Sequence, residues 1–132
     1  MYVPFGKAKY EFVIIATGAE YPQTFCDRTE IYNILEDTWV EGPKINQPRT
    51  RHTSVVVQNK YLYIIAGNNS SKNQKLDSIE RLDMTALELK WEPINIFNDE
   101  GKSGWRPRDS CGSFAVENKI ILFGGNSGWN SE

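Results

Sequence analysis

The residue types that most often do chemistry in proteins are scarce in this chain. Its 132 residues include one histidine, His52, and two cysteines, Cys26 and Cys111. A catalytic nucleophile needs a neighbouring base, and a zinc site needs several His or Cys ligands at short spacing. No C-x-x-C pair and no second histidine accompany these three residues. The sequence therefore predicts no catalytic residue, no metal and no cofactor.

Composition indicates a folded protein without a strongly charged surface. The chain is 39% hydrophobic and 24% charged, with a formal net charge of −2. This balance is typical of globular proteins, and the scattered Lys and Arg do not form the basic patch that nucleic acid or an anionic membrane attracts. We therefore expect no nucleic-acid partner and no membrane partner.

Cysteine usage and the apolar segments bear on location. Two cysteines without a framework fit a reducing compartment. The first residues lack the apolar core of a secretory signal, and apolar runs such as Phe12 to Ala16 are far too short to span a bilayer. We expect an intracellular, cytoplasmic protein, with association with the cytoskeleton as one alternative.

The elements that would position any functional residue are short apolar bursts, that is, runs of β-branched and aromatic residues. Such bursts are typical of strands, and the Gly and Asn clusters between them are typical of turns. The bursts are Phe12 to Ile15, Val55 to Val57, Tyr61 to Ile65 and Ile120 to Phe123. The sequence predicts a mostly antiparallel all-β fold, with at most one helical turn at Met84 to Leu89.

An internal repeat organises these strands. Residues 49–60 align with residues 108–119 without a gap, and residues 63–67 then align with residues 121–125. A second alignment places residues 29–33 on residues 79–83. Trp39 follows the first of these segments and Trp91 follows the second. Gly18 and Gly67 are 49 residues apart, and Gly67 and Gly125 are 58 apart. The chain is therefore built from units of about 50 residues.

This pattern resembles the kelch repeat, in which an Arg precedes the first strand, a diglycine ends the second, and a Tyr and a Trp mark the third and fourth. The markers in the middle repeat are Arg49, Ala66-Gly67, Leu82 and Trp91, and those that open the last repeat are Arg108 and Gly124-Gly125. The resemblance implies a partial kelch-type β-propeller with four-stranded antiparallel blades. We expect one region, 1–132, with blades at 1–46, 47–97 and 106–132, the last of them incomplete.

The resemblance also bears on function. Propellers typically have four to eight blades, so the chain is either a fragment of a longer protein or closes by self-association or by docking on partner chains. Kelch repeats imply a protein–protein interaction module, a scaffold or adaptor piece of an intracellular complex. Two alternatives stay open: a structural subunit of a large, for example cytoskeletal, assembly and, less favoured, a kelch-type metalloenzyme.

Candidate partner-binding residues lie in the predicted loops. The resemblance implies that positions shortly after the leading Arg line the binding face, and these positions hold Arg51 and Ser110. Trp105 and Trp129 fall in Gly-rich loops outside the repeat, where a tryptophan either anchors a partner or covers its own domain. Asn68 and Asn69 begin a polar loop. The plainer interpretation of Arg51 and of this loop is a solvated surface.

The residues at the repeat markers are expected to be structural. Arg49 and Arg108 should hold the loop between blades, and Trp39 and Trp91 should lie in the blade core. His52 is expected to be a packed or hydrogen-bonded residue instead of a general base.

Overall fold

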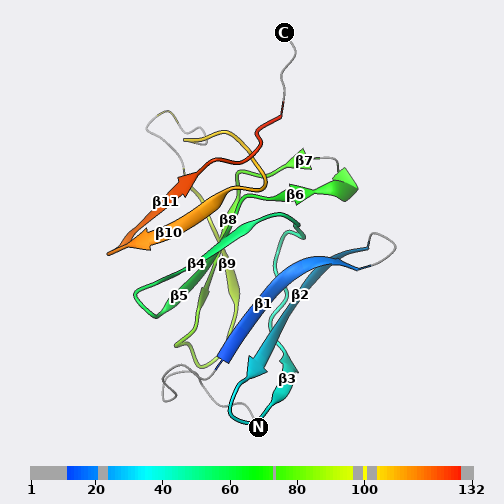
Figure 1. Cartoon of the computed structure of the whole chain (residues 1–132), viewed down its shortest axis with the longest axis vertical. Coiled ribbons are helices and arrows are strands. Elements are labelled where there is room, and N and C mark those ends of the chain that lie inside the picture. The colour runs from blue at the N-terminus through cyan, green and yellow to red at the C-terminus, as the bar shows by residue number, and fades with distance from the viewer. Residues whose placement is uncertain (1–11, 21–23, 73, 97–99, 101–103, 129–132) are drawn as a thin grey trace.

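A computed structural model shows an all-β chain arranged as three main antiparallel sheets side by side, with a fourth, small sheet of two short strands (Figure 1). The structure describes residues 12–20, 24–72, 74–96, 100 and 104–128. Within these residues the sheets do not close into a ring, and no helix is long and apolar enough to cross a membrane. The predicted fold class, all-β with a four-stranded antiparallel blade, is confirmed.

The first sheet has the order β1-β2-β3. Its strands are β1 (Phe12–Glu20), β2 (Thr24–Asn33) and β3 (Thr38–Glu41). Along β2 the residues alternate between two faces, as a pleated strand requires, so that Thr29 and Ile31 are buried while Glu30 is exposed. The buried face of this sheet is the face turned toward the second sheet, because Thr29 meets Trp91 there.

The second sheet is a complete four-stranded blade with the order β4-β5-β8-β9. Its strands are β4 (Thr53–Val57), β5 (Tyr61–Ile65), β8 (Ile79–Asp83) and β9 (Trp91–Ile94). The turn from β4 to β5 takes left-handed φ angles at Gln58 (55°) and Asn59 (52°), the conformation that tight hairpins favour. The bursts predicted at residues 55–57 and 61–65 are thus neighbouring strands joined by a tight hairpin turn.

The third sheet is the hairpin of β10 (Gly112–Val116) and β11 (Lys119–Phe123). A smaller hairpin rises from the loop between β5 and β8 and consists of β6 (Asn68–Asn69), the 3-10 turn η2 (Ser70–Lys72) and β7 (Gln74–Lys75). The segment Met84 to Leu89, for which at most one helical turn was predicted, contains turns and bends that connect β8 to β9.

Two apolar clusters hold the three sheets together. Between the first and second sheets lie Ile14, Ile45, Leu62, Ile64, Leu82, Met84, Leu89 and Trp91. Between the second and third sheets lie Val55, Tyr63, Ile65, Ala66, Ile79, Ile94, Trp105, Cys111, Ile120 and Leu122. Each face of the middle blade is therefore buried against a neighbour, as stacked repeats require.

One predicted core residue is wrong, namely Trp39. Trp91 is 1% exposed between two sheets, whereas Trp39 is 56% exposed and stacks on Tyr32 with ring centroids 4.8 Å apart. Tyr32 and Trp39 face away from the second sheet, because their cross-strand pair alternates with buried Ile31. A tryptophan at the repeat position is buried only where a neighbouring blade lies over it.

The diglycine position takes the same conformation in both repeats. Ala66 and Gly67 have φ angles of 64° and 101°, and Gly124 and Gly125 have φ angles of 69° and 87°. Ala66 thus departs from the diglycine marker in sequence while keeping its left-handed backbone. For an L-residue this conformation costs roughly 1–2 kcal/mol relative to the right-handed one.

Gly67 and Gly124 differ in the space around them, which gives a direct prediction. A Cβ at Gly67 would lie 2.7 Å from the Thr50 carbonyl oxygen, whereas nothing lies within 4 Å of a Cβ at Gly124. Gly67→Ala should therefore lower the free energy of unfolding by roughly 2–4 kcal/mol through clash and strain. Gly124→Ala should cost only about 1 kcal/mol, the strain alone. Urea denaturation of both variants tests this difference, and equal losses would contradict it.

Candidate functional site

The blade end at which β4 and β8 begin and β5 ends forms a rim of loops. Arg51 and Ser110, the two positions predicted from the repeat, meet there: the Ser110 backbone N–H donates to the Arg51 carbonyl oxygen at 2.8 Å. Both side chains are exposed, and both residues have left-handed φ angles, 54° and 55°. Such strained residues persist only when their surroundings enforce them, and they are enriched at functional sites.

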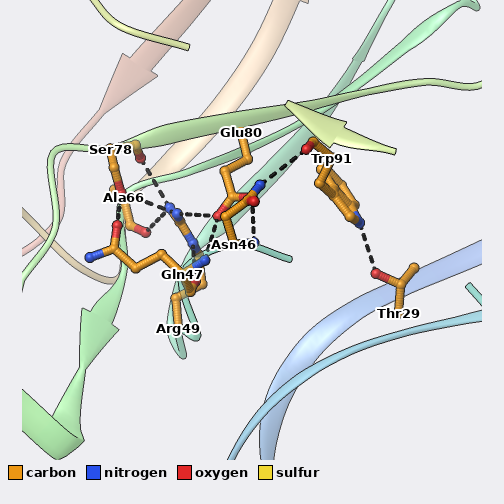
Figure 2. A network of polar contacts seen from close by, with 8 residues as sticks. All are labelled: Thr29, Asn46, Gln47, Arg49, Ala66, Ser78, Glu80 and Trp91. Atoms are coloured by element: carbon orange, nitrogen blue, oxygen red, sulfur yellow. Dashed lines mark hydrogen bonds and ion pairs between the residues drawn. The ribbon is translucent and has the colours of Figure 1, made fainter. Parts of the chain in front are cut away.

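Beneath this rim a buried ion pair fixes the loop that leads into β4 (Figure 2). The Arg49 guanidinium is fully buried and lies 3.0 Å from the Glu80 carboxylate. It also donates to the carbonyl oxygens of Ala66 (2.9 Å) and Ser78 (3.0 Å) and to Ser78 Oγ (3.1 Å). Burial lowers the pKa of Arg49 from its ordinary value, and Glu80 opposes this shift. The predicted role of Arg49 in holding the loop agrees with these contacts.

The carboxylate of Glu80 accepts further donors from the same loop. Its Oε2 receives the backbone N–H of Asn46 (2.8 Å) and the Asn46 side-chain amide (2.7 Å), and its Oε1 receives the Gln47 N–H (2.9 Å). Asn46 also donates to the Trp91 carbonyl, and the Trp91 indole donates to Thr29 Oγ1 at 2.9 Å (Figure 2). One chain of polar contacts thus runs from the rim to the first sheet.

The third sheet repeats part of this network around Arg108. Its Nε donates to the Arg106 carbonyl and its Nη1 to the Gly124 carbonyl (3.1 Å), as Arg49 does toward Gln47 and Ala66. Arg108 is only half buried. The structure therefore supports the predicted role of Arg108 in joining the loop to the end of β11.

Asp109 anchors the rim between the second and third sheets. It is buried, and Lys75 Nζ lies 3.3 Å from its Oδ2. Ser110 Oγ donates to Oδ1 at 3.1 Å, and Asn68 donates to Oδ2 at 3.5 Å. Burial alone would raise the pKa of Asp109, but these three hydrogen bonds lower it below its ordinary value. The carboxylate therefore stays charged and holds Ser110 beside Arg51.

The other candidate partner-binding residues from the sequence are Asn69, Trp105 and Trp129, and their positions differ. Asn69 is 3% exposed and accepts a hydrogen bond from Ser71, so its side chain stabilises the loop. Trp105 is half buried against the cluster between the second and third sheets, with the Arg108 guanidinium 5.9 Å from its ring centroid. Trp105 thus covers its own domain, the second of its two interpretations. Trp129 lies outside the described residues.

His52 lies under the rim as a packed residue, as the sequence predicted. Burial, with a smaller contribution from the nearby Arg49 charge, lowers its pKa to about 4. Among the described side chains its Nδ1 has no hydrogen-bond partner. A neutral imidazole in this position is a poor proton acceptor near pH 7.

The lowered pKa of His52 predicts a pH dependence of stability. The unfolded chain binds a proton near pH 6.5 and the folded chain only near pH 4, so acid favours the unfolded state. The stability that depends on neutral His52 is fully present above about pH 6.5. The free energy of unfolding should fall by about 3 kcal/mol as the pH falls to 4. Urea denaturation between pH 4 and 7 measures the loss. His52→Gln should flatten this part of the profile, and an unchanged profile in that variant would assign the loss to other groups.

The described residues also show how the possible metal ligands and the two thiols are placed. No three His, Cys, Asp or Glu side chains there are close enough together to hold a metal ion. Cys26 and Cys111 form no disulfide within the described residues, and burial raises the pKa of the Cys111 thiol, which keeps it protonated.

The fold and the rim thus define a blade of the propeller class, with paired loop positions at one end. Residues 48–97 match the family model of the Kelch motif. This segment contains the four-stranded sheet and the loop that carries Arg49. No curated protein matches the chain significantly. This segment is therefore a kelch repeat, which supports the predicted kelch family for this part of the chain. Kelch motifs generally act in protein–protein interaction.

Proposed function

We propose that this chain is a non-catalytic protein-interaction module, a scaffold or adaptor piece of an intracellular complex. Its binding surface is the rim between the second and third sheets, centred on Arg51 and Ser110. The observation that carries the proposal is the hydrogen bond that joins these two equivalent repeat positions. Two blades thereby present one shared surface instead of two separate loops.

The chemistry of this rim favours a partner segment with carboxylates. The Arg51 guanidinium is exposed, and its planar donors suit a carboxylate with two parallel hydrogen bonds. The Ser110 hydroxyl donates to Asp109, so its oxygen remains able to accept a hydrogen bond from a partner. Lys75 adds a second positive charge nearby, partly neutralised by Asp109. We infer that the rim binds an acidic peptide segment of another protein.

Replacing Arg51 tests the proposal. Peptides selected on the protein from a random displayed library should be enriched in Asp and Glu, and Arg51→Ala should weaken the best of them about tenfold. Arg51 is exposed and belongs to neither apolar cluster, so the fold should stay intact. Lys90→Ala, an exposed cation in the turn between β8 and β9, should change the affinity by less than twofold.

Two results would contradict the rim as the binding surface. One is a set of selected peptides without acidic residues. The other is an equal loss of affinity in the Arg51→Ala and Lys90→Ala variants, since that would reflect overall charge and not a site.

A further inference from the structure

The β9 edge of the middle blade contains a cavity of about 200 Å³ at the same blade end as the rim. Its lining comes from three segments: residues 46–49 of the loop that leads into β4, residues 77–80 at the start of β8, and residues 93–96 at the end of β9. All three segments belong to the complete four-stranded blade and its entry loop. The cavity is therefore formed within one repeat and does not depend on how the neighbouring sheets continue.

The size of this cavity limits what it can hold. It is smaller than the clefts of roughly 300–1,000 Å³ that hold drug-sized ligands. Among its lining residues Asn46, Pro93, Asn95 and Ile96 are exposed, so the cavity is open to solvent. One side chain of another protein is therefore a ligand of suitable size.

The charged residues of the lining favour a cation. Arg49 and Glu80 neutralise each other through their ion pair at 3.0 Å, and the guanidinium of Arg49 also donates to the acceptors drawn in Figure 2. Asp77 is the third charged residue, and among the described residues its carboxylate has no ion-pair or hydrogen-bond partner. The lining therefore carries one uncompensated negative charge, which attracts a cation and repels an anion.

Apolar residues line another side of the cavity. Pro93 pairs with Glu80 across β8 and β9, and Ile94 and Ile96 continue the lining beyond it. Basic side chains pack their aliphatic stems on apolar surface of this kind while the charged group meets a polar partner. Arginine fits better than lysine, because its planar guanidinium donates two parallel hydrogen bonds to one carboxylate and is more weakly hydrated.

We propose that this cavity binds the side chain of an arginine in a partner protein, whose guanidinium pairs with Asp77 while its stem packs on Pro93 and Ile96. The site lies apart from Arg51 and takes a ligand of the opposite charge. It therefore does not depend on the proposed function of the rim.

N-acetyl-arginine amide serves as the probe, because it carries this side chain and no other charge. Titrated into isotope-labelled protein, it should shift the NMR signals of residues 77, 78 and 95 until they saturate. For so few atoms we expect a dissociation constant on the order of 1 mM. N-acetyl-citrulline amide has nearly the same shape without the charge and should bind about tenfold more weakly, because a charge-assisted hydrogen bond is lost. The corresponding lysine compound should bind about threefold more weakly.

Protein variants complete the test. Asp77→Asn keeps the size of the side chain and should weaken binding of the arginine compound about tenfold, to the level of the citrulline compound. Glu88→Gln is the matched control: it removes the same charge from an exposed residue in the turn at the opposite blade end and should change the affinity by less than about twofold. The arginine and citrulline compounds alone keep the proposal testable if Asp77→Asn fails to fold. Arg51→Ala should leave the affinity unchanged, which separates the cavity from the rim.

Four results would overturn the proposal: no saturable shifts, an affinity for the citrulline or the lysine compound equal to that for the arginine compound, equal losses in Asp77→Asn and Glu88→Gln, or the largest shifts outside the three lining segments. Tighter binding of free L-arginine than of the blocked compound would overturn it as well, because the cavity would then be a site for the amino acid and not for a partner's side chain.

Discussion

Glu80→Ala is expected to lower the free energy of unfolding by about 3–5 kcal/mol, because it leaves the buried Arg49 charge without its counter-ion. Arg49 is 0% exposed, and Glu80 also accepts the N–H groups of Asn46 and Gln47. Removal of the carboxylate therefore takes the counter-charge from Arg49 and the acceptor from two backbone N–H groups. Since small domains are stable by only about 5–15 kcal/mol, the variant should be close to unfolding.

Chemical denaturation followed by circular dichroism measures this loss, and the chain offers a matched control. Glu92 forms an ion pair with Arg81 at 3.0 Å, the same distance as the buried pair, but on the surface. Glu92→Ala should cost less than about 1 kcal/mol, as exposed pairs do. A Glu80→Ala loss no larger than that of Glu92→Ala would show that the buried network does not hold the loop.

Trp91→Ala is expected to cost about 3–5 kcal/mol, whereas Trp39→Ala should cost less than about 1 kcal/mol. The two tryptophans occupy equivalent repeat positions, yet Trp91 lies between two sheets and Trp39 is exposed. Trp91 also donates its indole N–H to Thr29 Oγ1. Its removal opens a cavity where the first two sheets join.

The same denaturation experiment compares the two variants. Trp91→Phe separates the contributions, because it keeps most of the apolar volume and loses the hydrogen bond to Thr29, worth about 1 kcal/mol. Similar losses for Trp39→Ala and Trp91→Ala would contradict the exposed position of Trp39.

Local patterns in the sequence were sufficient to predict most of the strands. The bursts at residues 55–57 and 61–65 form β4 and β5, and the turn at residues 58–60 joins them, because strand and hairpin preferences depend on neighbouring residues. The repeat also predicted the structural role of Arg49 and the equivalence of Arg51 and Ser110. These predictions succeeded because the same local geometry occurs in both units.

Features that depend on neighbours far along the chain could not be predicted in this way. The burial of Trp39 depends on which face of the first sheet is covered, and no spacing within one repeat encodes that. Trp105 lies in an insertion outside the repeat, so its position against the core had no template. Glu80 was missed as the counter-ion of Arg49, although a signal was present: glutamate recurs at the equivalent position, Glu30.

The measurement that tests the rim most directly is amide chemical-shift mapping by NMR with a bound acidic peptide selected on the protein. We predict the largest shifts at Arg51, Asn68 and Ser110, with the opposite-end turns at residues 58–60 and 117–118 unaffected. Shifts confined to those turns, or to β3, would contradict the rim between the second and third sheets as the binding surface.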